Sequence, residues 1–118
     1  MDKDNNLLGY IYISHRAIAS IAYYSALESY GVVGFAPKNI AKGIANVLVK
    51  DPALGIDVRY DGNSVSIDLY IIVEYGTRIK SVASIVSDNV RFQIEKNLVV
   101  PVESVNVHVR GLRISDPD

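Results

Sequence analysis

The sequence predicts an α+β domain with two layers, in which helices cover one face of a β-sheet. Apolar residues recur with helical spacing over 15–30 and 77–97, and they alternate as in strands over 55–60, 64–75 and 102–112. Strands with a single apolar face need helices on one side of the sheet only. The 118 residues are enough for one such domain.

The N-terminal part is predicted to form a strand followed by a helix. The segment GYIYIS, residues 9–14, is rich in β-branched and aromatic side chains, which favour a strand. Ser14 is placed to cap the helix that we expect over 15–30. Gly31 follows this helix at a position where glycine can adopt the left-handed conformation.

A second helix is predicted over 37–49. Pro37 suits its first turn, where the missing N–H would have no partner, and Lys50, Asp51 and Pro52 are expected to end it. The apolar side of this helix would consist of Ile40, Ile44, Val47 and Leu48.

A hairpin follows, because the turn residues Asp61, Gly62 and Asn63 separate two alternating runs. The strands are expected over 55–60 and 64–75, and Gly76 is expected to break the second strand. The predicted inward face of the second strand consists of Val65, Ile67, Leu69, Ile71, Val73 and Tyr75.

The longest helix is predicted over 77–97 and is followed by a closing strand over 102–112, after Pro101. The helix would bury Ile79, Val82, Ala83, Val86, Val90 and Ile94. The strand would point Val105, Val107 and Val109 inward. The resulting order is β-α-α-β-β-α-β, similar to a KH core with an added C-terminal strand. We expect one domain over 8–112, with flexible ends at 1–7 and 113–118.

The composition excludes several functional classes. The net charge is −1 and the isoelectric point about 6.1, whereas nucleic-acid binders usually carry a basic excess. There is no cysteine, which excludes disulfides, thiolate nucleophiles and cysteine metal sites. The N-terminus does not resemble a signal peptide, and the longest apolar run, residues 69–73, is far too short to cross a bilayer. We therefore expect a cytoplasmic protein without direct membrane insertion.

The G-x-x-G at residues 31–34 supports two interpretations. In KH domains such a loop between two helices holds the backbone of single-stranded RNA, but it usually carries a basic residue in the middle. Here the middle consists of two valines, so the favoured interpretation is a turn that packs two helices. The RNA-binding alternative would use Gly31, Val32, Val33, Gly34, Lys38 and Lys42.

The sheet face away from the helices is the predicted contact surface. Strand alternation points several aromatic and basic side chains to this face, and such residues are typical of protein interfaces and of base-stacking platforms. Asp57, Asp68 and Glu74 on the same face would repel phosphate, which favours a protein partner. The predicted interface residues are Tyr10, Tyr12, Arg59, Tyr70, Ile72, His108 and Arg110.

No motif for catalysis, cofactor binding or metal binding is present, so we expect a non-enzymatic protein without a cofactor. His15 and His108 are far apart in the sequence. Asp57 and Asp68 can face each other across the hairpin, which leaves a carboxylate pair conceivable, but each is expected to pair with a neighbouring arginine or with solvent.

The ordered set of motifs resembles the alkaline shock protein family of bacterial envelope stress response proteins. The segments that carry the resemblance are GYIYIS, YGVVGFA, GIDVRYDGNSVSIDLYIIVEYG, IKSVASIVSDNVRFQIE and VESVNVHVRGL, within residues 8–112. The resemblance implies a scaffold or adaptor in cell-envelope homeostasis. It also implies self-association, and attachment at the membrane through a small membrane-anchored protein partner.

Overall fold

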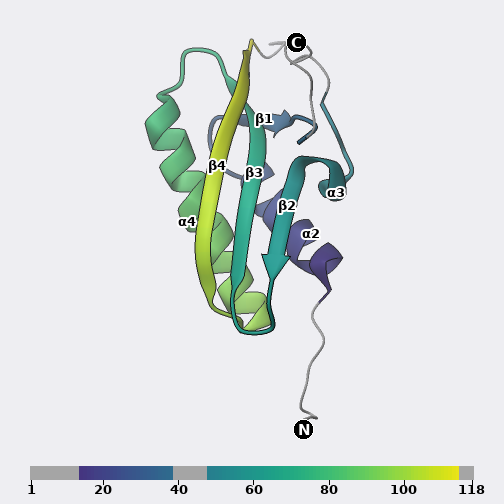
Figure 1. The fold of residues 1–118 in the computed structure, drawn as a ribbon. Coiled ribbons are helices and arrows are strands. Elements are labelled where there is room, and N and C mark those ends of the chain that lie inside the picture. The colour runs from purple at the N-terminus through teal and green to yellow at the C-terminus, as the bar shows by residue number, and fades with distance from the viewer. Residues whose placement is uncertain (1–13, 39–47, 115–118) are drawn as a thin grey trace, which may run out of the picture.

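The computed structural model describes residues 14–38 and 48–114, and within them it shows two layers (Figure 1). The sheet lies in front, and the two long helices lie behind it. The predicted α+β class is therefore confirmed, while the predicted strand over 9–14 lies outside the described residues except for Ser14. The elements are α2 (His15–Leu27), β1 (Val32–Phe35), α3 (Pro52–Gly55), β2 (Ile56–Tyr60), β3 (Val65–Glu74), α4 (Ile79–Leu98) and β4 (Val102–Arg113).

β3 is the central strand of the four-stranded sheet. β4 runs parallel to it along one side, after the crossover through α4 that parallel neighbours require. The other side of β3 is shared. β2 pairs antiparallel with residues 65–69 and β1 antiparallel with residues 71–73. β1 and β2 therefore run end to end in the same direction, like two parts of one strand. At their junction the Ala36 N–H donates to the Tyr70 carbonyl at 2.9 Å.

α2 begins where the sequence predicts, because the Ser14 hydroxyl accepts a hydrogen bond from the Ala17 N–H at 3.0 Å. It ends at Leu27, three residues earlier than predicted. A tight turn follows, in which the Ser29 hydroxyl donates to the Ser25 carbonyl at 3.0 Å. Gly31 completes the turn with a φ of +89°, the left-handed conformation predicted for it.

The prediction of a turn between two helices at residues 31–34 is wrong. Val32–Phe35 is strand β1, in agreement with the β-branched and aromatic character of three of its four residues. Phe35 is fully buried and stacks on Tyr23, with ring centres 5.0 Å apart. This aromatic pair packs β1 against α2. Residues 32–35 are therefore part of the sheet and not a turn between two helices.

The predicted helix over 37–49 falls mostly on residues 39–47, outside the described part. Pro37, Lys38, Leu48 and Val49 are not helical, and Val49 instead forms a β-bridge with Phe35. Asp51 and Pro52 begin the short helix α3 rather than ending a longer one. The Asp51 carboxylate accepts the Ala53 N–H at 3.0 Å, as an N-cap does.

The C-terminal half agrees closely with the prediction. β2, a turn with Gly62 at a φ of +95°, and β3 form the expected hairpin. The inward residues of β3 from Val65 to Val73 are fully buried, as are four residues of α4: Val82, Val86, Val90 and Ile94. Val105, Val107 and Val109 pack against this core while partly exposed. Tyr75 and Ile79 are exposed, contrary to prediction, because they lie in and just after the turn that connects β3 to α4.

Candidate functional site on the outer face of the sheet

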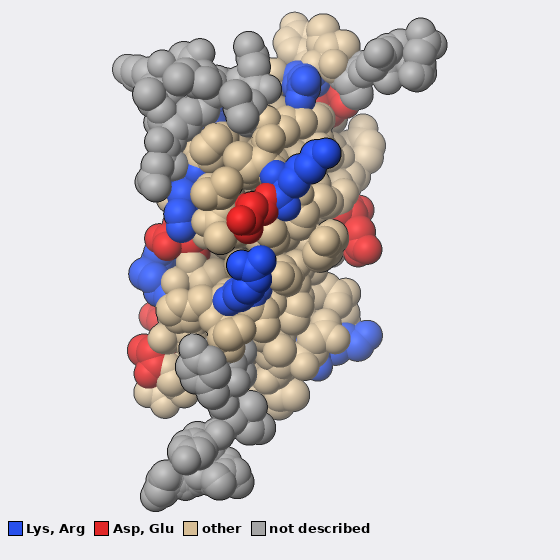
Figure 2. All heavy atoms as spheres, turned by 90° about the vertical axis from the view of Figure 1, so that its right-hand side faces the viewer, with Lys and Arg blue, Asp and Glu red and all other residues tan. Residues whose placement is uncertain are grey.

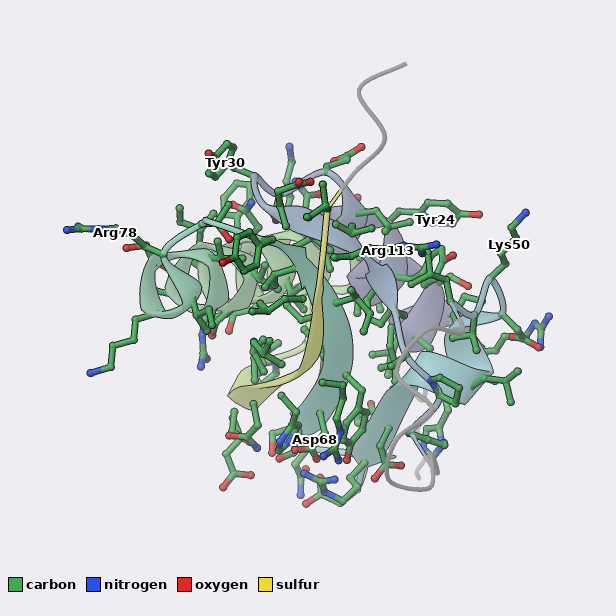
Figure 3. The ribbon with its side chains drawn as sticks, turned by 90° about the horizontal axis from the view of Figure 1, so that it is seen from above. Tyr24, Tyr30, Lys50, Asp68, Arg78 and Arg113 are labelled. Atoms are coloured by element: carbon green, nitrogen blue, oxygen red, sulfur yellow. The ribbon has the colours of Figure 1, made fainter. Side chains whose placement is uncertain are left out.

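The sheet face that points away from α2 and α4 carries a connected set of charged and aromatic side chains. We call this face the outer face. Pairing places Asp57 of β2 beside Asp68 of β3, and Tyr70 beside His108 of β4. Figure 3 shows Asp68 on the side of the sheet opposite the helices. The outer-face cluster consists of Asp57, Arg59, Asp68, Tyr70, His108 and Arg110.

Asp68 lies at the centre of the outer-face cluster, and 14% of its side chain is exposed. Its carboxylate accepts a hydrogen bond from Arg59 Nη1 at 2.6 Å and lies 2.9 Å from His108 Nε2. Burial raises the pKa of Asp68, but the hydrogen bonds from His108 and Arg59 outweigh it, so the pKa is lower than usual. The contact with Asp68 also raises the pKa of Arg59. Asp68 is thus a fixed negative charge.

The predicted carboxylate pair exists, but it is arranged as an ion-pair network. Arg59 Nη1 lies 3.2 Å from the Asp57 carboxylate as well as contacting Asp68, and Lys38 Nζ lies 4.0 Å from Asp57. A general acid needs a raised pKa, whereas that of Asp68 is lowered. Within residues 14–38 and 48–114 no group of three His, Cys, Asp or Glu residues is placed to hold a metal ion.

The aromatic part of the cluster is a stack. The Tyr70 and His108 rings lie 4.7 Å apart with an interplanar angle of 13°, and the Arg110 guanidinium lies 4.8 Å from the Tyr70 ring centre. The position of Arg110 comes from a β-bulge. Val109 pairs with Ile71 and Gly111 with Ile72, so Arg110 is an extra residue in β4. Bulges redirect side chains in this way and are common near functional sites.

Four of the seven predicted interface residues are brought together by the sheet. Arg59 and Arg110 are exposed, while Tyr70 and His108 are half-buried within the cluster. Tyr10 and Tyr12 lie outside the described residues. Sequence analysis placed Asp57 and Asp68 on this face and expected an arginine beside them, and Arg59 is that arginine. It missed the contact between Asp68 and His108, which depends on the register of β3 and β4.

The prediction that Ile72 is exposed is wrong, since its exposed fraction is 1%. The core cluster contains Ile71 and Val73 but not Ile72, as expected for a side chain on the other face of the strand. Its neighbours in the sheet are Gly34 and Gly111, which have no side chains. A Cβ atom on Gly34 would lie 3.2 Å from a methyl carbon of Leu48. The chain therefore folds over the outer face beside Ile72, and the accessible cluster ends at Tyr70 and Arg110.

The residues of the RNA-binding alternative that the structure describes do not form a loop between two helices. Val32, Val33 and Gly34 belong to β1, and Lys38 Nζ donates to the Ile56 carbonyl at 3.4 Å, while Lys42 lies outside the described residues. Figure 2 shows the side of the molecule that carries α2, α3 and β2, where basic and acidic side chains are interspersed. The described side chains on this side form a mixed surface rather than the basic stripe that is typical of phosphate binding.

The fold and the outer-face cluster together define a small two-layer α+β domain with a networked polar surface on its sheet. The chain belongs to the alkaline shock protein 23 family, which has a cell envelope-related function and whose match spans residues 3–114. Among the described residues no helix is long and apolar enough to cross a membrane.

Relatives in two bacteria cover nearly the whole chain. The uncharacterized protein YloU of Bacillus subtilis is 40% identical over 111 residues, 92% of each chain. An uncharacterized protein of Streptococcus pyogenes serotype M6 is 32% identical over 114 residues, 95% of this chain and 94% of its own. A solved MamM CTD structure, a zinc form, has a TM-score of 0.52 at 17% identity and covers 86% of this chain and 89% of its own. This likeness concerns the fold alone.

Proposed function

We propose that the protein is a non-enzymatic scaffold or adaptor in cell-envelope homeostasis and that its outer-face cluster binds a protein partner. The family's envelope-related function supports the general role. The observation that carries the mechanism is the outer-face cluster itself, because its side chains are fixed by each other and stay accessible. Arg59 has 52% of its side chain exposed and His108 has 41%. Arginine and tyrosine held rigidly at a surface are typical of binding hot spots.

The nature of the cluster favours adaptor work over catalysis. Its carboxylates are paired with Arg59 and Lys38, so the cluster is poorly suited to exchange protons with a substrate. The proposed location is the cytoplasm. A membrane-anchored partner bound at this face would hold the protein next to the membrane. A second copy of the chain is a further partner that the same face can accept.

Site-specific photocrosslinking in cells that carry the protein tests this function. A photoreactive residue is placed at Asn106, which is exposed on the outer face and whose side chain hydrogen-bonds Asp68, and in a separate variant at Ser84, which is exposed on α4. Arg59 and His108 still hold Asp68 when Asn106 is replaced. We expect a protein adduct at position 106 that survives ribonuclease and sediments with membranes, and no such adduct at position 84. Equal adducts at both positions, or an adduct that ribonuclease removes, would contradict the proposal.

A further inference from the structure

Arg110 differs from Arg59 and His108 in the outer-face cluster, because its charge has no ionic partner among the described residues. Arg59 binds two carboxylates, and His108 is held by Asp68. Arg110 is exposed and makes no hydrogen bond or ion pair to any residue in 14–38 or 48–114. Its specific contact within these ranges is the Tyr70 ring, and the guanidinium carbon lies over this ring, 4.8 Å from its centre.

A cation–π contact of this kind restrains an arginine without supplying a hydrogen-bond acceptor. The attraction is between the positive charge and the ring, so the guanidinium N–H groups still need acceptors. Tyr70 is in turn stacked on His108, whose Nε2 is fixed by Asp68 at 2.9 Å. The bulge and the stack together prepare Arg110 to accept an anionic group without further loss of side-chain freedom.

The chemistry around Arg110 favours a carboxylate of a protein over a nucleic-acid backbone. An isolated arginine edge matches one carboxylate, which it binds through two parallel hydrogen bonds. A nucleic acid would bring several phosphates close to Asp57, whose side chain is 46% exposed, and to Asp68. The Tyr70 hydroxyl makes no hydrogen bond to the described residues and supplies one further donor near the guanidinium.

We propose that Arg110, held over the Tyr70 ring, receives the carboxylate of a single aspartate or glutamate side chain of a protein partner. This inference deepens the proposed function and rests on it, since it names the chemistry that the outer face recognises. Arg110 is then the residue that selects the partner. Arg59 keeps the surface around it in place through Asp68.

An NMR titration of the isotope-labelled full chain with tetraglutamate tests the inference. Tetraglutamine and tetrathymidylate are the comparison ligands. We expect tetraglutamate to shift the amide signals of Tyr70, His108 and Arg110 in a saturable way, with an affinity that falls as salt rises. Arg110→Gln should weaken binding about tenfold or more, because a hydrogen-bonded charge pair is lost. Arg110→Lys should have an intermediate affinity, since lysine keeps the charge but not the two-pronged geometry.

Arg78→Gln is the matched control, because Arg78 is also exposed but lies just before α4, away from Asp68 (Figure 3). It should bind tetraglutamate like the unmodified protein.

The inference is overturned if tetraglutamate leaves the three signals in place, if Arg110→Gln binds it equally well, or if tetrathymidylate binds at the same site with equal affinity. If Arg110→Gln loses tetraglutamate but keeps the adduct at position 106, the carboxylate contact is not what holds the partner and the adaptor function stands. If no protein adduct forms in cells while tetraglutamate still binds, the adaptor function fails instead.

Discussion

Gly55 and Phe35 are packed so closely that a Cβ atom on Gly55 would lie 2.9 Å from the Cβ atom of Phe35. This contact brings the end of α3 against β1, at the point where β1 gives way to β2 along β3. Phe35 cannot move aside easily, because it is fully buried and stacked on Tyr23. Position 55 therefore needs glycine for steric reasons, because any side chain would clash with Phe35.

Gly55→Ala should lower the free energy of unfolding by about 1–3 kcal/mol, the usual range for a methyl group forced into a packed core. Urea unfolding followed by circular dichroism measures this change. Gly34→Ala is the matched control. Its new Cβ atom would meet the side-chain methyl groups of Leu48 at 3.2 and 3.4 Å, and Leu48 is only half-buried and can shift. An equal loss in the two variants would contradict the explanation.

Asp68→Asn should lower the free energy of unfolding by about 1–2 kcal/mol at neutral pH, because hydrogen bonds to a charged group are weakened. The difference from the unmodified protein should depend on pH. The pKa of Asp68 is lowered in the folded state, so its contribution is fully present above the unfolded-state value of about 3.9 and is lost as the pH falls through the lower folded-state value. Urea unfolding between pH 7 and pH 3 should therefore show the two proteins converge at acid pH. A difference that stays constant over this range would contradict the role assigned to Asp68.

Val99→Gly should stabilise the protein. Val99 ends α4 in the left-handed conformation, with a φ of 52° and its N–H bonded to the Glu95 carbonyl at 3.2 Å. This conformation costs a residue with a side chain about 1–2 kcal/mol, of which the greater freedom of glycine in the unfolded chain offsets a part. Because Val99 is 86% exposed, little burial is lost. We expect a gain of about 1 kcal/mol in thermal or urea unfolding.

Val100→Gly is the control for this gain, since Val100 is 6% exposed and packs in the core. It should destabilise the protein by about 1–3 kcal/mol through lost burial. If Val99→Gly were also destabilising, the left-handed end of α4 would not be a source of strain.

Ser29→Ala should loosen the contact between the two long helices. The Ser29 hydroxyl, 5% exposed as a residue, accepts a hydrogen bond from Asn89 Nδ2 of α4 at 2.9 Å and donates to the Ser25 carbonyl of α2. Removing the hydroxyl should cost about 1–2 kcal/mol, because it joins both helices. Hydrogen exchange should then rise at the end of α2 more than in β3. Ser81→Ala, at an exposed position of α4, should change neither quantity.

Periodicity was sufficient to predict the hairpin, α4 and β4, because in these segments each local preference agrees with burial in the final structure. It failed at residues 31–35 and 51–55. There Val32, Val33 and Phe35 favour a strand by composition, but they find a partner because β3 extends past β2 and leaves residues 71–73 unpaired by it. Such a pairing depends on the tertiary structure, so the sequence of the four residues alone predicts it only weakly. Two prolines, Pro37 and Pro52, were interpreted as the limits of one helix, whereas Pro52 begins a separate short one.

The candidate site was predictable in its outline. Alternation alone placed Arg59, Tyr70, His108 and Arg110 on one face, as the structure also has them. The contacts among them were not predictable, since they depend on the register of three strands. The bulge that brings Arg110 over Tyr70 also depends on that register.

The end-to-end arrangement of β1 and β2 has a consequence for how the chain folds. β2, β3, α4 and β4 are consecutive in sequence and can form a hairpin and a crossover through short loops, whereas β1 reaches β3 only after closing a loop of more than 30 residues. We expect the rate-limiting step to assemble the C-terminal half first, with α2 and β1 docking later. Val86→Ala should then slow refolding, while Ala22→Gly should mainly accelerate unfolding. In this order of assembly, the last step in forming the sheet is the pairing of β1 with residues 71–73 of β3.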